Sequence, residues 1–435
     1  MNIKRSGSSG SWSCAAAATA LGLILAASSG QIVQAQEDAI AAVRTLTLDE
    51  ALTLAARSDP ALPGVGARRR AAEAGVRQAD VRPNPVVGLE IENFAGSGPY
   101  SLIDRSETTL SYSQPFERGG DRTARVGLAR REGDLASARD RVRRLDRAEQ
   151  VQTAWVQALA AEADLQIASE RLTLAEQFDA EVRRRVASAR DPLFAGARSD
   201  AELASAELIF DQAGIAARLA RANLATFWMG PSNFRLDPTA FADTRAARIA
   251  AQGAAEADLA VIAAERDIAA AQLSVEQARA VPDATINVGL RHHWEEGALA
   301  FVVGGSMPLG RYDQNRGAIE RAQSNRLASE SDLVAERAAR DREIARLQVS
   351  LAARATEARR IVEDILPQAE RAVALVREGF NRGGFTYNDV IQAQAALLET
   401  RERRIQVLTA FHIDRARLDR LTGAHDRTTV SEIEQ

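Results

Sequence analysis

The segment Gln114-Pro115-Phe116-Glu117-Arg118 recurs in altered form as Met307-Pro308-Leu309-Gly310-Arg311, and the two prolines lie 193 residues apart. Met229-Gly230 and Thr422-Gly423, which each close a helical pattern, show the same offset of 193 residues. A repeat at a fixed offset indicates that one structural unit occurs more than once. We therefore expect the chain of 435 residues to hold two similar units and a short tail, at 36–235, 236–425 and 426–435.

Proline positions and hydrophobic periodicity divide each unit into the same elements. Pro83 ends a first helix, expected from the capping box at Thr47 to about Val81, because proline cannot continue a helix. Period-two alternation, as in Val87-Gly88-Leu89-Glu90-Ile91, indicates strands, and helical spacing resumes after Pro115 and at the matching place in the second unit. The elements expected after the first helix are a β-hairpin at 86–114, a long helix at 117–190 and a return helix at 197–229, then a helix at 244–280, a β-hairpin at 284–307, a long helix at 310–383 and a return helix at 387–422.

These elements predict a fold that is mainly α with a small β part. Each long helix would measure about 110 Å, and shorter helices stacked end to end would run back along it as antiparallel helical hairpins. Apolar strand residues alternate with Glu90, Glu92 and Arg291, a pattern typical of strands with a lipid face and a wet lumen.

Four strands cannot stand alone in a membrane, because every strand edge there must be paired. Known barrels start at about eight strands, so we expect a barrel shared by two or three chains above an α-barrel made of the packed helices. Three chains would supply twelve strands. The alternative interpretation is a soluble coiled-coil protein with two incidental hairpins.

The composition excludes several classes of function. Lys4 is the only lysine and Cys14 the only cysteine, and both lie in a segment that we expect to be removed. The mature chain would then have no P-loop, Schiff-base lysine, thiol nucleophile, disulfide or cysteine metal site. No catalytic triad or carboxylate pair stands out, so we expect neither an enzyme nor a cofactor. The net charge of −4 gives no reason to expect nucleic-acid binding.

The first 35 residues are typical of an export signal. Lys4 and Arg5 precede a small apolar run from Cys14 to Ala27, and Val33-Gln34-Ala35 supplies small residues for cleavage near Ala35. An uncleaved anchor and lipidation at Cys14 are the alternatives. No later run is long and apolar enough for a membrane helix, so we expect the mature chain in the periplasm or the outer membrane.

Several short motifs resemble one family of channels. They are Leu46-Thr47-Leu48-Asp49-Glu50-Ala51-Leu52, Arg82-Pro83-Asn84-Pro85, Glu90-Ile91-Glu92-Asn93, Glu107-Thr108-Thr109-Leu110 and Ser113-Gln114-Pro115-Phe116-Glu117-Arg118-Gly119-Gly120. Over essentially the whole mature chain, the sequence resembles the trimeric outer-membrane efflux channels of the TolC family. It looks most like the branch that serves cobalt–zinc–cadmium resistance pumps. That branch usually continues the last motif with Lys-Arg, whereas this chain has Asp121-Arg122.

The resemblance implies a passive exit duct. A homotrimer in outer-membrane lipid would form a 12-stranded barrel over a periplasmic helical tunnel. Its closed end would dock a periplasmic adaptor (a membrane fusion protein) and an inner-membrane RND pump driven by protons. The expected cargo is heavy-metal cations, selected by the pump. A duct for drugs or secreted proteins, and a periplasmic coiled-coil scaffold without a pore, remain as alternatives.

The resemblance also places working residues at the helix turns. The adaptor contacts would be Gly383, Gly384, Phe385 and Thr386 in the second unit and Pro192, Leu193 and Phe194 in the first. A purely structural alternative is that Gly384 lets the chain turn with a positive φ. Asp389 matches a gate aspartate of the family, and Gln392 stands at the second gate position. The alternative for Asp389 is a carboxylate favoured at a helix N-terminus.

One dense group of possible metal ligands occurs, His292-His293-Trp294-Glu295-Glu296. It follows the third strand, where adjacent residues point to opposite faces, so the two histidines cannot easily share one ion. We interpret the group as a loop rim with an interfacial tryptophan rather than as a metal site. No protein metal site is therefore expected.

Overall fold

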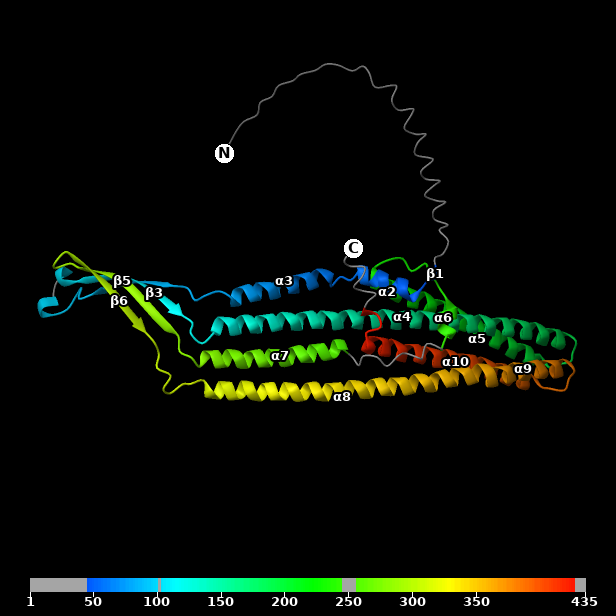
Figure 1. Ribbon diagram of the computed structural model, residues 1–435. Coiled ribbons are helices and arrows are strands. Elements are labelled where there is room, and N and C mark those ends of the chain that lie inside the picture. Colours follow the sequence, from blue (N-terminus) through cyan, green and yellow to red (C-terminus); the bar gives the residue numbers. More distant parts are fainter. Residues whose placement is uncertain (1–44, 101–102, 245–255, 427–435) are drawn as a thin grey trace, which may run out of the picture.

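The protein is an elongated helical rod with a β-sheet at one end (Figure 1). The computed structural model describes residues 45–100, 103–244 and 256–426. The expected export signal with its cleavage site at Ala35, the start of the helix expected at 244–280 and the last nine residues of the tail lie outside the described residues.

The first half of the chain begins with two helices where the sequence predicts one. Helix α2 (Leu48–Arg57) starts at the predicted capping box, in which Thr47 and Glu50 each bind the other's backbone N–H. The prediction of a continuous helix to Val81 is wrong, because the chain leaves the helix before Pro60 and resumes as α3 (Leu62–Ala79). A proline at that position removes a helical hydrogen bond and clashes with the preceding turn.

The long helix α4 (Asp121–Ala187) and the return helix α5 (Leu193–Ala225) follow. Helix α4 begins four residues later than expected because Gly120 has a φ of 81°, which a right-handed helix cannot include. A 3₁₀ turn at Thr226–Trp228 closes α5. The strand β1 (Thr45–Leu46) pairs in parallel with β4 (Arg235–Leu236), and the short helix α6 (Pro238–Ala242) follows β4. The sequence did not predict these three small elements.

The second half contains α7 (Glu256–Arg279), α8 (Arg316–Arg360), α9 (Leu366–Asn381) and α10 (Tyr387–Thr422). The long helix expected at 310–383 starts later, because Asn315 before α8 has a φ of 55°. A π-helical turn at Ile361–Ile365 also interrupts it. Pro367 is the second residue after this turn, and the wider turn accommodates a proline that cannot make the normal helical bond.

Pairs of shorter helices, arranged end to end, pack along the long helices. Helix α4 contacts α7 and α5, and Figure 1 places α7 toward the sheet and α5 toward the opposite end. This is the stacking predicted from the helix lengths. The main core lies where α2, α4, α5, α6 and α10 meet, around Trp155, Leu159 and Leu408. Within the described residues, no helix combines the length and apolar character needed to cross a membrane.

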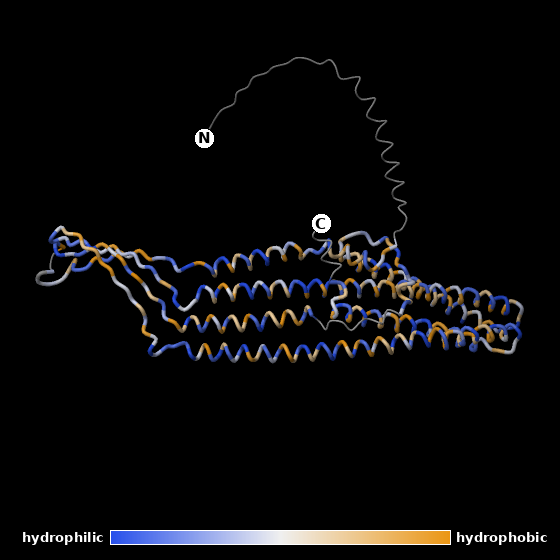
Figure 2. Tube along the Cα trace, in the orientation of Figure 1, coloured by the Kyte–Doolittle hydropathy of each residue, from blue (hydrophilic) through white to orange (hydrophobic). Residues whose placement is uncertain are grey.

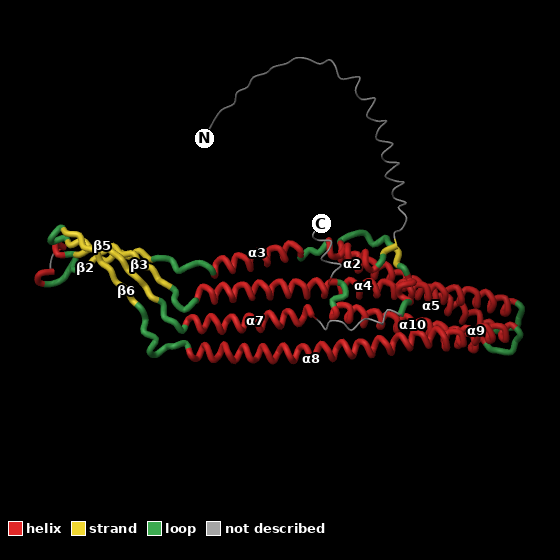
Figure 3. Tube along the Cα trace, in the orientation of Figure 1, coloured by secondary structure: helices red, strands yellow, loops and turns green. Residues whose placement is uncertain are grey.

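The sheet consists of four antiparallel strands in the order β2-β3-β5-β6, yellow in Figure 3. The strands are β2 (Val86–Glu92), β3 (Glu107–Phe116), β5 (Ala284–His293) and β6 (Ala298–Ser306). Leu89, Leu110, Leu290 and Phe301 form one row across all four strands. Strands β2 and β6 are the two edges, and within the described residues neither has a further strand partner.

Candidate functional site

The sheet has one apolar and one polar face. Directly paired residues share a face, so the row through Leu89 and Phe301 and the row through Val87 and Val303 lie on the same side. These side chains are exposed, Phe301 to 89% and Val303 to 77%. Figure 2 shows hydrophobic and hydrophilic positions alternating along the strands. An exposed apolar face that extends across all four strands indicates contact with an apolar surrounding.

The polar face carries an ion-pair network at the end of the sheet farthest from the helices. Arg291 bridges Glu92 and Glu107 with N–O distances of 2.9 Å to each. Its Nε also donates to Oγ1 of Thr109 at 2.9 Å. The sequence placed Arg291 and Glu92 on the polar side, but it did not predict that they contact each other.

The two adjacent histidines point to opposite faces, as predicted. The His292 ring packs edge-on against Trp294 at 4.8 Å between centroids, whereas Nδ1 of His293 lies 3.6 Å from Oε1 of Glu107. Trp294 donates through Nε1 to Oγ1 of Thr108, which ties this rim to β3. In the described part of the chain, no group of three or more His, Cys, Asp or Glu residues is placed to hold a metal ion.

The Gln114–Gly120 motif forms the joint between the sheet and the helices. Gln114 Nε2 donates to the carbonyl oxygens of Pro83 and Pro115 at 3.1 and 3.0 Å. Glu117 forms an ion pair with Arg125 of α4. Arg82, Asn84 and Pro85 are exposed in the adjoining link between α3 and β2.

Gly119 closes the joint against α7. A Cβ atom at this position would lie 2.1 Å from the carbonyl oxygen of Ala278, so only glycine allows the approach. The backbone N–H of Arg118 donates to Oδ1 of Asp283 at 3.1 Å, next to β5. These motif residues therefore stabilise the joint between the sheet and the helices.

The turn between α4 and α5 and the turn between α9 and α10 lie together at the other end of the rod, which we call the tip (Figure 1). Leu193 and Phe194 are 84% and 71% exposed, and Pro192 is the N-cap residue of α5. Phe385 is also exposed, although its ring lies against Gly379. Of the predicted contact residues, Leu193, Phe194 and Phe385 thus expose apolar side chains at the tip.

The second turn differs from the prediction in one detail. Gly383, and not Gly384, has the positive φ, at 83°. The N–H groups of Gly383 and Gly384 bond to the carbonyl oxygens of Phe380 and Gly379. Helix α9 therefore ends at Asn381, two residues before the end expected at 383, and the left-handed glycine lies one residue earlier than expected.

Asp389 forms a capping box with Thr386 at the start of α10. Asp389 Oδ2 accepts from the N–H and from Oγ1 of Thr386, both at 2.7 Å. These hydrogen bonds hold the pKa of the Asp389 carboxyl below its ordinary value. Gln392 is exposed about one helical turn later, so the two gate candidates share a side of α10. The capping geometry agrees with the alternative interpretation of Asp389 as a helix N-terminal carboxylate.

Two arginines that the sequence interpretation overlooked cross-link the tip. Arg185 of α4 pairs with Asp191 and donates to the carbonyl oxygen of Phe380 at 3.1 Å. Arg198 of α5 donates to Oδ1 of Asn388 at 2.8 Å and lies 4.9 Å from the centroid of the Tyr387 ring. The only local signal was the spacing of Arg185, near the end of the long helix expected at 117–190, and Asp191, the residue just after it.

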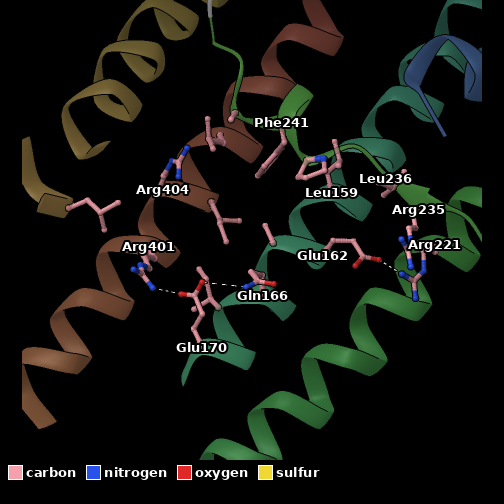
Figure 4. Close-up of a pocket in the computed structure, with 17 residues that line it drawn as sticks. Leu159, Glu162, Gln166, Glu170, Arg221, Arg235, Leu236, Phe241, Arg401 and Arg404 are labelled. Atoms are coloured by element: carbon pink, nitrogen blue, oxygen red, sulfur yellow. Dashed lines mark hydrogen bonds and ion pairs between the residues drawn. The ribbon is translucent and has the colours of Figure 1, made fainter. Parts of the chain in front are cut away.

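A cavity of about 840 Å³ lies between α4, α5, α10 and the β4–α6 segment (Figure 4). Leu159, Phe241 and Ile405 form part of its apolar wall. Arg221 pairs with Glu162 and Arg401 with Glu170 across it. No residue that the sequence analysis singled out lies in this cavity.

Comparison with known proteins identifies the family. A model of the outer membrane efflux protein family matches residues 51–228 and 252–424. The chain belongs to the outer membrane efflux protein family.

This outer membrane efflux protein has relatives in Cupriavidus metallidurans. It is 29% identical to the cobalt-zinc-cadmium resistance protein CzcC over 383 residues, which cover 87% of this chain and 90% of that protein. It is 28% identical to the nickel and cobalt resistance protein CnrC over 66% of this chain and 68% of that protein. The fold is similar to that of the outer membrane protein VceC from Vibrio cholerae, with a TM-score of 0.67, 20% identity and coverage of 86% of this chain and 96% of that one.

Proposed function

We propose that the protein is the outer-membrane exit duct of a tripartite efflux system for heavy-metal cations of the cobalt–zinc–cadmium type. The observation that carries the proposal is the sheet, which has an exposed apolar face, a polar face and two edge strands that lack partners within the described residues. Lipid would cover the apolar face, and the polar face would line a water-filled passage. The duct would be passive, with no chemical reaction of its own.

The proposed assembly is a homotrimer. Strand β6 of one chain would pair with β2 of the next, which closes twelve strands and leaves no edge in the bilayer. The helices would line up below it as a periplasmic tube. The two matches to the family model support the expected internal repeat, with units near 36–235 and 236–425. Residues 1–35 would be the export signal, cleaved near Ala35.

The proposed partners are a periplasmic adaptor and an inner-membrane RND pump driven by protons. The adaptor would bind the tip, where Leu193, Phe194 and Phe385 expose apolar surface. Asp389 and Gln392 would face the axis just inside the tip and form the gate. Three Asp389 carboxylates close together would attract cations and repel one another.

The cargo assignment rests on the relatives, because CzcC and CnrC are named for resistance to cobalt, zinc, cadmium and nickel. The test is to delete the gene from its host and measure growth in Co²⁺, Zn²⁺ and Cd²⁺, beside growth in dyes and detergents. Sensitivity to metals alone, restored by the wild-type chain, supports the proposal. Sensitivity to organic compounds alone supports a drug duct.

A second measurement separates a duct from a scaffold. Outer membranes are extracted, and the purified oligomer is inserted into planar bilayers. Reproducible pores from a heat-sensitive trimer support the proposal. A protein that is released without detergent and forms no pores would instead be a periplasmic coiled-coil scaffold.

A further inference from the structure

One guanidinium occupies the space between two carboxylates on the polar face of the sheet. Glu92 and Glu107 are direct partners in the register of β2 and β3, a position where like charges destabilise a pair. Arg291 of β5 reaches across β3, with Nη2 2.9 Å from Glu92 and Nη1 2.9 Å from Glu107. The Arg291 side chain is 30% exposed, so the network borders the solvent on this face.

The same positions hold the donor types that divalent transition metals prefer. His293 is the direct partner of Glu107 in the register of β3 and β5, and its Nδ1 lies 3.6 Å from Oε1 of Glu107. Two carboxylates and an imidazole are ligands that Zn²⁺ and Co²⁺ take in proteins. Arg291 lies among these donors and already forms an ion pair with each of the two glutamates.

Glu90 also lies on this face, in the row of Thr109 and Arg291, and beyond that row, toward the helices, the face is uncharged. The residues of this face that follow the network toward the joint include Gly88, Ser111, Asn287, Gly289 and Gly304. A cation moving along the face would therefore meet the carboxylates at the outer end. Conduction requires that binding there be weak enough for the ion to leave.

We propose that Arg291 prevents the outer end of the polar face from retaining divalent cations, by occupying the Glu92–Glu107 pair. The inference rests on the proposed function, in which these cations are the cargo and leave at this end. Arginine suits the role because its guanidinium stays charged at any physiological pH and its planar fork reaches two carboxylates at once. Arg291 is a specificity-determining residue that acts on the cargo through Glu92 and Glu107.

The test measures Co²⁺ binding to the purified full-length protein in detergent, by calorimetry and by the visible absorption of bound Co²⁺. We expect Arg291→Gln to bind Co²⁺ about tenfold more tightly than the wild type or better, because a cationic competitor is removed. A second change, Glu107→Gln in the Arg291→Gln protein, should abolish the gain. The matched control is Arg105→Gln, which loses one exposed ion pair, with Glu295, in the neighbouring loops and should leave Co²⁺ affinity unchanged.

A second readout does not require metal to be the cargo. In planar bilayers with K⁺ as the current carrier, micromolar Co²⁺ should block Arg291→Gln channels and leave wild-type channels open. Arg291→Lys keeps the positive charge and should preserve the fold, but it lacks the planar guanidinium that reaches both glutamates. Its Co²⁺ affinity should therefore fall between those of the wild type and Arg291→Gln.

Two results overturn the inference. The first is an Arg291→Gln protein that migrates as the wild-type oligomer and gains no Co²⁺ affinity. The second is a wild-type protein that already binds Co²⁺ in a way that Glu107→Gln removes. If Arg291→Gln gains Co²⁺ binding while the wild-type chain does not restore metal resistance to the deletion strain, the role of Arg291 is supported and metal cargo is not. The two failures are therefore distinguishable.

Discussion

Arg185 of α4 and Phe380 of α9 join the two helical hairpins at the tip. Nη1 of Arg185 donates to the carbonyl oxygen of Phe380 at 3.1 Å, and the guanidinium carbon lies 4.3 Å from the centroid of the phenyl ring. Asp191 fixes the same guanidinium with hydrogen bonds of 2.8 and 3.1 Å. One side chain therefore connects the turn after α4 with the end of α9.

Arg185→Ala should loosen the tip and so favour opening of the proposed duct. The change removes a cation–π contact and the hydrogen bond to Phe380, together about 1–3 kcal/mol of coupling between the hairpins. We expect a higher open probability of the purified oligomer in planar bilayers, with an unchanged conductance of the fully open state. Single-channel recording at fixed voltage measures both quantities.

The matched control is Arg184→Ala. Arg184 is the neighbouring residue on α4, its side chain is 74% exposed, and its ion pair with Glu181 lies within the same helix. It should leave the open probability unchanged. If Arg185→Ala channels stay closed as often as the wild type, the hairpins are held by other contacts, such as the one from Arg198 to Asn388.

The capping box at the tip predicts a pH-dependent stability. The hydrogen bonds from Thr386 lower the pKa of Asp389 below its ordinary value of 3.8. A carboxyl whose pKa is lower in the folded state stabilises the fold above its unfolded pKa, and this contribution is lost as the pH falls through the folded pKa. Asp389→Asn should therefore lower Tm at neutral pH, and the difference from the wild type should shrink below about pH 4.

Thr386→Val provides the comparison for this test, because it removes one of the two groups that donate to Asp389. Its Tm should lie between those of the wild type and Asp389→Asn at neutral pH, and N-cap changes typically cost about 1 kcal/mol. A Tm difference for Asp389→Asn that persists unchanged into strong acid would show that the carboxylate charge has no part in the cap. Channel recordings of Asp389→Ala and Gln392→Ala then test the gate separately.

Local sequence patterns predicted the helices and strands. They could not predict the contacts between residues that are distant in sequence. Helix α10 occupies the expected 387–422 because a capping threonine and a terminal Gly423 are both readable in sequence. The two faces of the sheet also followed from alternation. The break before α3 was not predicted, although Pro60 is a helix-breaking residue that can be identified in the sequence.

The network around Arg291 shows why the site was harder to predict than the fold. Arg291 meets Glu107 only because β5 lies beside β3 in one particular register, and 184 positions separate the two residues in sequence. A shift of one residue would turn Arg291 to the apolar face. The same holds at the tip, where Arg198 and Asn388 are 190 positions apart.

Gly119→Ala should disrupt the joint between sheet and helices. The new Cβ would lie 2.1 Å from the carbonyl oxygen of Ala278, so the backbone of α7 or of the segment just before α4 would have to move. We expect a loss of about 2 kcal/mol or more in the free energy of unfolding and less of the proposed heat-sensitive trimer in outer membranes. Quantitative gel migration without boiling measures the trimer.

The control for this change lies in the second turn of α4, the helix that begins two residues after Gly119. Gly127 of α4 has no atom within 4 Å of the position a Cβ would take. Gly127→Ala should stabilise the protein by about 0.5–1 kcal/mol, because alanine favours the helix. Equal trimer yields from the two alanine variants would argue against a close approach at Gly119.

His412 predicts a second pH dependence, in the middle of the rod. It is buried, its ring stacks on Phe241 at 5.5 Å between centroids, and its Nε2 lies 2.9 Å from the Phe241 carbonyl oxygen, so Nε2–H donates. Burial is the main cause that lowers the pKa of His412, and Arg415 lowers it further, while the bond to Phe241 and the charge of Asp243 act against them. The folded state therefore resists protonation of this ring.

A histidine whose pKa is lower in the folded state adds stability that is fully present above the unfolded pKa of 6.5 and is lost as the pH falls below it. Wild-type Tm should thus drop between pH 7 and pH 5. His412→Gln keeps an N–H donor without the titrating ring, so its Tm should change less over that range, and His292→Gln at the exposed rim serves as the control. If wild type and His412→Gln lose Tm in parallel, other groups set the acid sensitivity and α6 is not held by a neutral imidazole.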